Sequence, residues 1–210
     1  MENVREEIIG LAMEKMRQVG IKSISIDDLC HEIGISKKTF YVYFAAKDDL
    51  IAEMLRKHEE SLMNNVEQAV AGKTVLDLLL GFMQIAGETK DVRRVPPLVH
   101  DLKKYYSMLY KEHLERVRAF ARDVMREQIA RGVEEGLFRA DLDVEKTATI
   151  MAFAHNEMLN VAPNLPEDKH ITAWIHTRYA MDIFMRGIIS ERGKQLVAEK
   201  LEGRNGTLSK

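Results

Sequence analysis

The chain has 210 residues, of which 46% are hydrophobic and 30% charged, a balance typical of a folded globular protein and not of a disordered or membrane-embedded one. Its longest apolar run falls well short of the roughly 20 residues that a membrane-spanning helix needs, and its acidic N-terminus is unlike a signal peptide. Because the only cysteine is Cys30, no intrachain disulfide can form. We therefore expect a cytoplasmic protein that does not associate with membranes.

The charge is unevenly distributed along the chain. A formal net charge of −2 argues against a protein that coats nucleic acid, because phosphate contacts need local positive charge. However, Lys37, Lys38 and Lys47 occur in one short stretch that contains no acidic residue. This basic stretch favours a protein that places a few side chains on DNA.

Helical spacing of apolar residues runs through nearly the whole sequence, and alternating strand patterns are absent. The first predicted helix spans about Asn3–Val19 and stops at Gly20. Ser25 and Asp28 have the spacing of a capping box at the start of a second helix, which ends near Ile33 where Gly34 permits a positive φ. Ser36 can cap a third, short helix that runs to about Phe44.

The later helices have less distinctive boundaries. A break at Gly72 separates the fourth helix from the fifth, prolines open the sixth, Gly136 ends a long one, and the polar stretch from Gly203 to Lys210 reads as a frayed tail. An interruption of the Tyr105 helix near Ser107 is left open. The remaining predicted helices are Lys47–Ala71, Thr74–Thr89, one entered by Pro96 and Pro97, Tyr105–Glu135, Asp143–Val161 and His170–Ser190.

Three short helices within about the first 45 residues, the last two joined by Gly34-Ile35-Ser36, indicate a helix-turn-helix. The apolar side chains of this region have the spacing of a small core, and Cys30 lies where the two helices approach and a small side chain is needed. We expect the third helix to present Lys37, Lys38, Thr39, Val42 and Tyr43 outward, as a helix in the major groove would. The predicted core residues are Leu29, Ile33, Ile35 and Phe40.

The stretch from Ser25 to Leu50 resembles the DNA-binding domain of the TetR family. In that family a capped helix is followed by a Gly-Val-Ser turn, a Thr-Leu-Tyr recognition helix, an aromatic pair ending in Phe, and Lys-Glu-Glu-Leu. The corresponding segments here are Gly34-Ile35-Ser36, Thr39-Phe40-Tyr41, Tyr43-Phe44 and Lys47-Asp48-Asp49-Leu50. Weaker similarity to family members lies in Gly132–Asp143 and Arg186-Gly187-Ile188.

The resemblance implies a set of DNA-contacting residues. Lys47, at a helix N-terminus, is expected to bind a phosphate, the tyrosine hydroxyls to bind backbone oxygens, and the tip of the recognition helix to reach base edges. Two positions depart from the family: Lys38 replaces a frequent glycine and should add a contact, and Asp27 replaces a basic or polar residue and is interpreted as serving the helix dipole. The predicted DNA-binding residues are Ser25, Ser36, Lys37, Lys38, Thr39, Tyr41, Tyr43 and Lys47.

Residues beyond the motif supply candidates for a ligand pocket and a dimer interface. Most of the pocket candidates are aromatic residues with helical spacing, which we interpret first as core residues. Because ligand pockets of helical proteins lie within the core, the two interpretations overlap. For His155 the dimer interface, the ligand pocket and solvent exposure all stay open. The pocket candidates are Phe82, Tyr105, Tyr106, Met108, Tyr110, His113, Phe120, Met151 and His155. The dimer-interface candidates are Met158, Trp174, Ile175, Tyr179, Ile183 and Phe184.

The sequence thus predicts an all-α fold of about nine helices, in which an N-terminal three-helix helix-turn-helix DNA-binding domain (residues 1–46) precedes a helical ligand-binding and dimerisation domain (47–193) and a C-terminal extension and tail (194–210). The resemblance implies a homodimeric repressor that a small hydrophobic or amphipathic ligand releases from a palindromic operator in double-stranded DNA.

Two other classes of protein, an enzyme and a structural adaptor, fit the sequence less well. A helical di-metal enzyme needs two Glu-x-x-His repeats on facing helices, and the only such spacing, at Glu167 and His170, falls in a proline-flanked loop. Phosphate-binding loops and hydrolase motifs are also missing. A purely structural helical adaptor would leave the N-terminal motif unexplained. We expect no enzymatic activity, no cofactor and no metal site.

Overall fold

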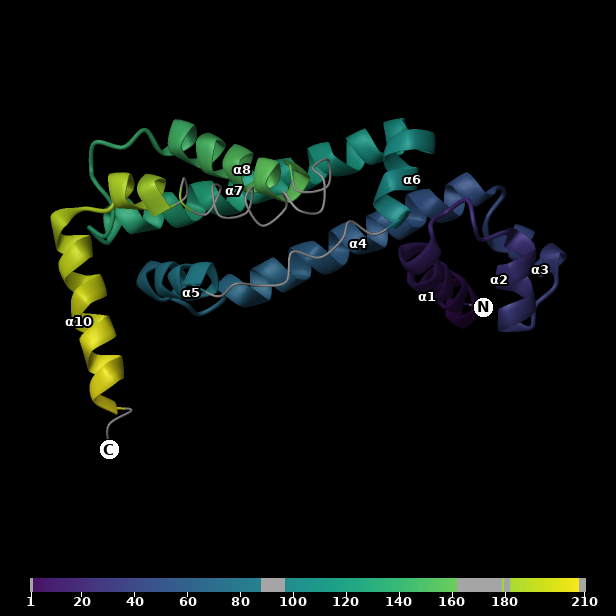
Figure 1. Cartoon of the computed structure of the whole chain (residues 1–210), viewed down its shortest axis with the longest axis horizontal. Coiled ribbons are helices and arrows are strands. Elements are labelled where there is room, and N and C mark those ends of the chain that lie inside the picture. The colour runs from purple at the N-terminus through teal and green to yellow at the C-terminus, as the bar shows by residue number, and fades with distance from the viewer. Residues whose placement is uncertain (1, 88–96, 162–178, 180–181, 208–210) are drawn as a thin grey trace. The chain divides into compact units, whose positions relative to one another are not determined.

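The computed structural model describes residues 2–87, 97–161, 179 and 182–207 (Figure 1). The chain divides into two compact units, and each is described by itself. The first comprises Met1–Asn65 and Arg94–Val117, and the second comprises Val66–Arg93 and Arg118–Lys210. Within the described residues, the regular structure is helical, as the sequence predicted, apart from one isolated bridge between Phe138 and Ile189.

The first unit is built on one apolar core. It contains α1 (Glu2–Val19), α2 (Ile26–Ile33), α3 (Lys37–Tyr43), most of α4 (Lys47–Val70), α6 (Pro97–Tyr105) and the start of α7 (Ser107–Glu134). Full burial of a large apolar side chain contributes roughly 1.5–3 kcal/mol, so this core is the main source of the unit's stability. Its fully buried side chains include Ile8, Met16, Ile21, Leu29, Phe40, Leu50 and Ile51.

Local signals in the sequence set the boundaries of α2 and α3. Ser25 caps α2 through a complete capping box with Asp28, and Ser36 caps α3 by accepting a hydrogen bond from the Thr39 amide. Gly34 follows α2 with φ of 78°, a left-handed conformation in which a side chain would be strained. The predicted boundaries of both helices, including the reasons for them, are confirmed.

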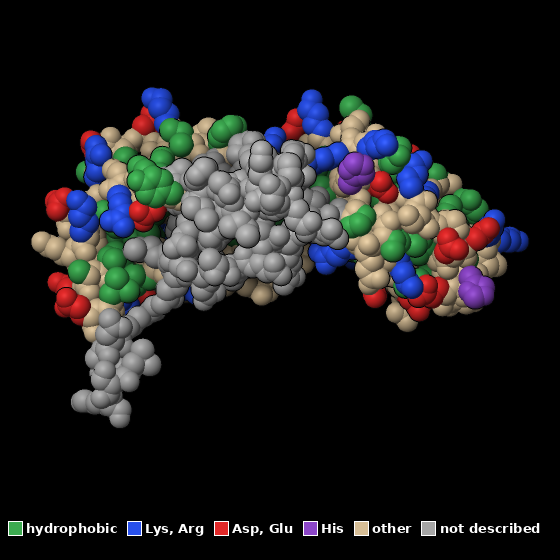
Figure 2. Space-filling model, viewed as in Figure 1, with side chains coloured by type: hydrophobic (Ala, Val, Ile, Leu, Met, Phe, Trp, Pro, Cys, Tyr) green, Lys and Arg blue, Asp and Glu red, His purple; other side chains and the backbone are tan. Residues whose placement is uncertain are grey.

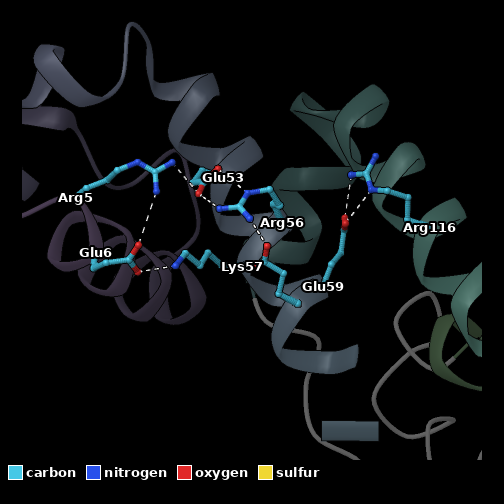
Figure 3. A network of polar contacts seen from close by, with 8 residues as sticks. Arg5, Glu6, Glu53, Arg56, Lys57, Glu59 and Arg116 are labelled. Carbon is cyan, nitrogen blue, oxygen red and sulfur yellow. Dashed lines mark hydrogen bonds and ion pairs between the residues drawn. The ribbon is translucent and has the colours of Figure 1, made fainter. Parts of the chain in front are cut away.

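Charged side chains tie α1 to α4 (Figure 3). Glu53 accepts hydrogen bonds from Arg56 on its own helix and forms an ion pair of 2.8 Å with Arg5 of α1. Lys57 and Glu6 form a second bridge of 2.8 Å between the same helices. The hydrogen bond from Arg56 outweighs burial and, together with Arg5, lowers the pKa of Glu53 to about 2. Glu53 is thus ionised whenever the protein is folded near neutral pH.

A buried carboxylate joins α4 to α7 within the same unit. Glu59 is only 6% exposed, and its oxygens accept hydrogen bonds of 2.8 and 2.9 Å from Arg116. The Nδ1 atom of His113, also buried, lies 2.8 Å from Glu59. Burial opposes ionisation of Glu59, but the bonds from Arg116 and His113 hold the pKa of its carboxyl below the usual value. A buried charge is tolerated when paired in this way.

The second unit has its own core. It contains α5 (Val75–Gly87), the rest of α7, α8 (Val144–Val161), the helical residues 182–188 and α10 (Glu191–Thr207). Gly136, with φ of 73°, follows α7 as predicted. The core side chains include Val75, Leu79, Leu80, Ile129, Leu137, Phe138, Ala148, Ile188 and Val197.

Helix α10 corrects the prediction for the C-terminus. The sequence predicted a frayed polar tail from Gly203, whereas α10 continues to Thr207. Gly193 lies so close to the Leu137 carbonyl that a Cβ atom would come within 2.1 Å of its oxygen. Ser190 donates a 2.6 Å hydrogen bond to the Gly136 carbonyl, and Lys200 pairs with Asp77 of α5. Tertiary contacts hold this helix in place, and the periodicity of its sequence did not indicate them.

Two other predicted helices can be compared with the structure. The interruption near Ser107 that the sequence left open is present, because α6 ends at Tyr105 and α7 begins at Ser107. Of the predicted helix His170–Ser190, the helical residues 182–188 are described and 170–178 lie outside the described residues. No helix within the described part of the chain has the length and apolar composition to cross a membrane.

Candidate nucleic-acid interface

The inner face of α3 fixes the position of this short helix. Phe40 is completely buried, and its ring contacts the edge of Tyr41 at a centroid distance of 5.5 Å and the ring of Phe44 at 5.6 Å. Leu29 and Cys30 of α2 belong to the same core, together with half-buried Ile33 and Ile35, so the predicted core of the motif is confirmed. Because α3 is anchored by large aromatic side chains, its outer face is held in a defined orientation.

The outer face of α3 combines basic and apolar groups. Lys37 and Lys38 are exposed, and Tyr41 and Val42 are 51% and 71% exposed. Thr39 is half-buried, as is Tyr43, which packs against the core. An exposed valine beside lysines is unfavourable in water but matches the major groove, where thymine methyl groups lie among hydrogen-bond acceptors. This face thus exposes the kinds of side chain, basic and apolar, that recognition in the major groove uses.

The two serines predicted to contact DNA are engaged as helix caps. The Ser25 hydroxyl donates to Asp28 at 2.6 Å, and the Ser36 hydroxyl lies 3.0 Å from the Thr39 amide and 2.9 Å from its hydroxyl. The hydrogen bonds from Ser25 lower the pKa of Asp28. Any contact of Ser25 or Ser36 with DNA thus stays a prediction and would have to coexist with a cap.

Lys47 has partners that the sequence did not suggest. Its ammonium group donates to the carbonyl of Ile21 at 2.6 Å and also to the carbonyl of Ile24, both in the turn between α1 and α2. Burial and the nearby positive charge of Lys22 lower the pKa of Lys47. An ammonium has three donors, so one stays available for the predicted phosphate contact. The residue therefore holds the turn as well as being a candidate for binding DNA.

Asp27 does more than interact with the helix dipole, which was the role predicted from the sequence. It lies in the first turn of α2, and its carboxylate is 2.7 Å from the ammonium of Lys37, the first residue of α3. Over α2 and α3, Figure 2 shows acidic side chains directly beside basic ones. The basic stretch seen in the sequence is thus partly neutralised by an acid from the preceding helix.

The pocket candidates fall into both units. In the first unit His113 is buried, and Tyr106 and Tyr110 pack against the core. Tyr105 and Met108 are 46% and 70% exposed, so their interpretation as core residues is wrong. The change from α6 to α7 explains the error, because residues on either side of it do not share one helical face. In the second unit Phe120 and Met151 are half-buried, and the side chains of Phe82 and His155 lie outside the described residues.

The dimer-interface candidates are only partly described. Tyr179 and Ile183 are exposed, whereas Phe184 packs against the core of the second unit. Trp174 and Ile175 lie outside the described residues, as does the side chain of Met158. Ile150 and Phe153 of α8, which were not predicted from the sequence, are further exposed apolar residues, one turn apart. Their i, i+3 spacing was the signal that could have found them.

The chain combines a capped helix-turn-helix, whose recognition helix exposes basic and apolar side chains, with a second helical unit. This combination defines a DNA-binding transcriptional regulator. The sequence model described as "Bacterial regulatory proteins, tetR family" matches residues 8–54, which include the whole motif. This match runs from within α1 to the first part of α4.

Relatives and solved structures agree with that match. The transcriptional repressor KstR2 of Mycolicibacterium smegmatis is 24% identical over 67% of this chain and 70% of its own length. A TetR-family regulator from Cytophaga hutchinsonii has a similar fold, with a TM-score of 0.65 at 17% identity over 90% of this chain and 96% of its own. A regulator from Saccharomonospora viridis in complex with choline has a TM-score of 0.63 at 17% identity, over 91% of this chain and 100% of its own.

The chain carries at residues 8–54 a DNA-binding domain that matches the TetR family, and it has the fold of TetR-family regulators. Like its homologues, the chain is a DNA-binding regulator and not an enzyme. The resemblance drawn from the sequence is therefore confirmed.

Proposed function

We propose that the protein is a repressor that binds a palindromic operator as a homodimer in the cytoplasm and leaves it when a small hydrophobic or amphipathic molecule binds. The single observation that carries DNA recognition is the outer face of α3, where Lys38, Tyr41 and Val42 are exposed on a helix whose other face is anchored by Phe40. Two such helices, related by a two-fold axis, would read two half-sites.

Dimerisation is supported by exposed apolar residues in the second unit. Ile150 and Phe153 lie on α8, and Tyr179 and Ile183 lie in the segment that follows; each is more than half exposed in the single chain. A monomer seldom leaves several large apolar side chains of one region in water. Burial of the same surface on two copies gives an isologous interface, which is the commonest arrangement in homodimers.

Effector binding is supported by the second helical unit and by the regulator that shares this fold and was solved with choline. An effector can change DNA affinity only if it binds the DNA-competent and DNA-incompetent states with different affinities. We assign to the pocket of this unit the two candidates predicted from the sequence that are half-buried in it, Phe120 and Met151.

Capture of DNA fragments tests the proposal directly. Purified protein is mixed with sheared genomic DNA from its source, and the retained fragments are sequenced. We expect enrichment of one or a few fragments that share an inverted repeat, and loss of enrichment for Val42→Asp, which places a carboxylate on the exposed face of α3 without disturbing the core. Retention of fragments without a shared repeat would refute the two-half-site proposal.

A further inference from the structure

We propose that Asp27 is a specificity-determining residue that acts as an internal counterion for Lys37 and thereby weakens binding to random DNA. The proposal rests on the DNA-binding role of α3. It concerns a residue that would not touch a base, and whose negative charge is otherwise hard to reconcile with a surface that approaches phosphates.

The geometry supports a direct pairing across the motif. Asp27 belongs to α2 and Lys37 to α3, and their charged atoms are 2.7 Å apart. Both side chains are 60% exposed, so the pair lies on the surface and not in the core. Among the ion pairs of the described residues, Lys37 has this acidic partner, whereas the neighbouring Lys38 appears in none. Of the two adjacent lysines of the recognition helix, one would therefore approach DNA already paired with a carboxylate, and the other would not.

Electrostatics then separates random from specific binding. An exposed ion pair stabilises the fold by only about 0–1 kcal/mol, so stability gives little reason for the pair. Random DNA is bound mainly through phosphate neutralisation and release of counterions, with a slope of log affinity against log salt of about −0.9 per phosphate neutralised. A lysine already paired with a carboxylate contributes less to that release. Contacts with base edges are less affected, so the ratio of specific to random affinity rises.

The decisive measurement is the affinity of the folded protein for a random-sequence duplex at several salt concentrations. For Asp27→Asn we expect an affinity gain of about tenfold at low salt and a slope steeper by about one unit, which is the effect of one freed lysine charge. Glu32→Gln is the matched control. Glu32 is also an exposed acid of α2, but it pairs at 2.8 Å with Lys15 of α1, so its removal changes net charge equally without freeing Lys37.

A second pair of variants shows whether Asp27 acts through Lys37. In a Lys37→Met background, Asp27→Asn should have no more effect than Glu32→Gln. Thermal unfolding of each variant confirms that it is folded. The proposal is overturned if Asp27→Asn and Glu32→Gln behave alike in the wild-type background, or if the full effect of Asp27→Asn persists without Lys37. Neither outcome depends on an operator being found, so the failure of this proposal is distinct from failure of the palindromic model.

Discussion

At the scale of single residues, the turn between α1 and α2 depends on side chains from two later helices. Lys47 of α4 donates to the carbonyls of Ile21 and Ile24, and Asp101 of α6 accepts a 2.9 Å hydrogen bond from the amide of Lys22. Gly20 opens this turn with φ of 89°. Backbone groups that have no helical partner are thus satisfied by side chains. The conformation of this turn also determines where α2 begins.

Replacement of Lys47 by methionine should therefore destabilise the protein as well as weaken DNA binding. Two carbonyls would lose a charged donor, which costs about 1–3 kcal/mol. The free energy of unfolding in urea measures this loss, and Lys111→Met is the control because Lys111 is an exposed lysine of α7. Equal stability of the two variants would show that the ammonium does not hold the turn.

Lys38 is predicted to read a guanine in each half-site. Its ammonium extends further than the glycine frequent in the family could, and guanine offers two acceptors in the major groove. Lys38→Gly should lower affinity for the preferred operator by about 1–3 kcal/mol per half-site and affect random DNA much less. Selection of binding sites by wild type and variant checks this. An unchanged preference at every base would mean that Lys38 only contacts the backbone.

At the scale of elements, the DNA-binding helices could be predicted and the C-terminal one could not. The boundaries of α2 and α3 follow from local chemistry, since Ser25, Gly34 and Ser36 each satisfy or release backbone groups within a few residues. The identity of the family followed from the same stretch. Such signals are readable because donor and acceptor are close in sequence.

Helix α10 lacks signals of that kind. Its sequence is polar and contains Gly193, Gly203 and Gly206, and glycine lowers helix propensity by about 1 kcal/mol relative to alanine. What holds it is the approach of Gly193 to the carbonyl of Leu137, more than fifty positions earlier in the chain. The pairing of Asp27 with Lys37 and the bonds of Lys47 were missed for a similar reason, because periodicity does not indicate which side chains meet across helices.

The cap of α3 can be separated from any DNA contact of Ser36. Ser36→Ala should lower stability by about 1 kcal/mol, because the Thr39 amide loses its acceptor. Ser36→Asp should keep the cap and the stability, since aspartate caps as well as serine, but should weaken DNA binding by its negative charge. Thermal unfolding and DNA titration together distinguish the two effects. A stable Ser36→Ala variant would contradict the role of the cap.

Gly193→Ala tests whether α10 is held by close backbone packing. A methyl group there must displace the Leu137 carbonyl or the helix, and overpacking of this kind costs about 1–3 kcal/mol. Gly187→Ala is the control, because a Cβ atom at that helical position meets nothing within 4 Å. Unfolding in urea should show a loss of stability only for Gly193→Ala. A similar result for both variants would place α10 elsewhere than against Leu137.

At the scale of the whole molecule, two copies are expected to associate. Sedimentation at micromolar concentration should give twice the chain mass of 24.1 kDa. Phe153→Glu should give a monomer, because a charge cannot be buried unpaired in the interface. Met108→Glu replaces a similarly exposed apolar residue of the first unit and should leave the dimer intact. A monomeric wild type would defeat the dimer and the two-half-site proposal together.

The core of the first unit has a practical consequence for exchanging parts between regulators. Leu50, Ile51 and Met54 of α4 and Leu102 of α6 are buried in the same core as the helix-turn-helix. A hybrid protein joined at residue 46 would therefore pack the first three helices of one parent against the buried residues of α4 and α6 of the other parent. The packing of this core would be mismatched. A junction preserves that core when it transfers the α4 residues together with the residues of α6 and of the start of α7 that pack against them, among them Leu109 and Tyr110.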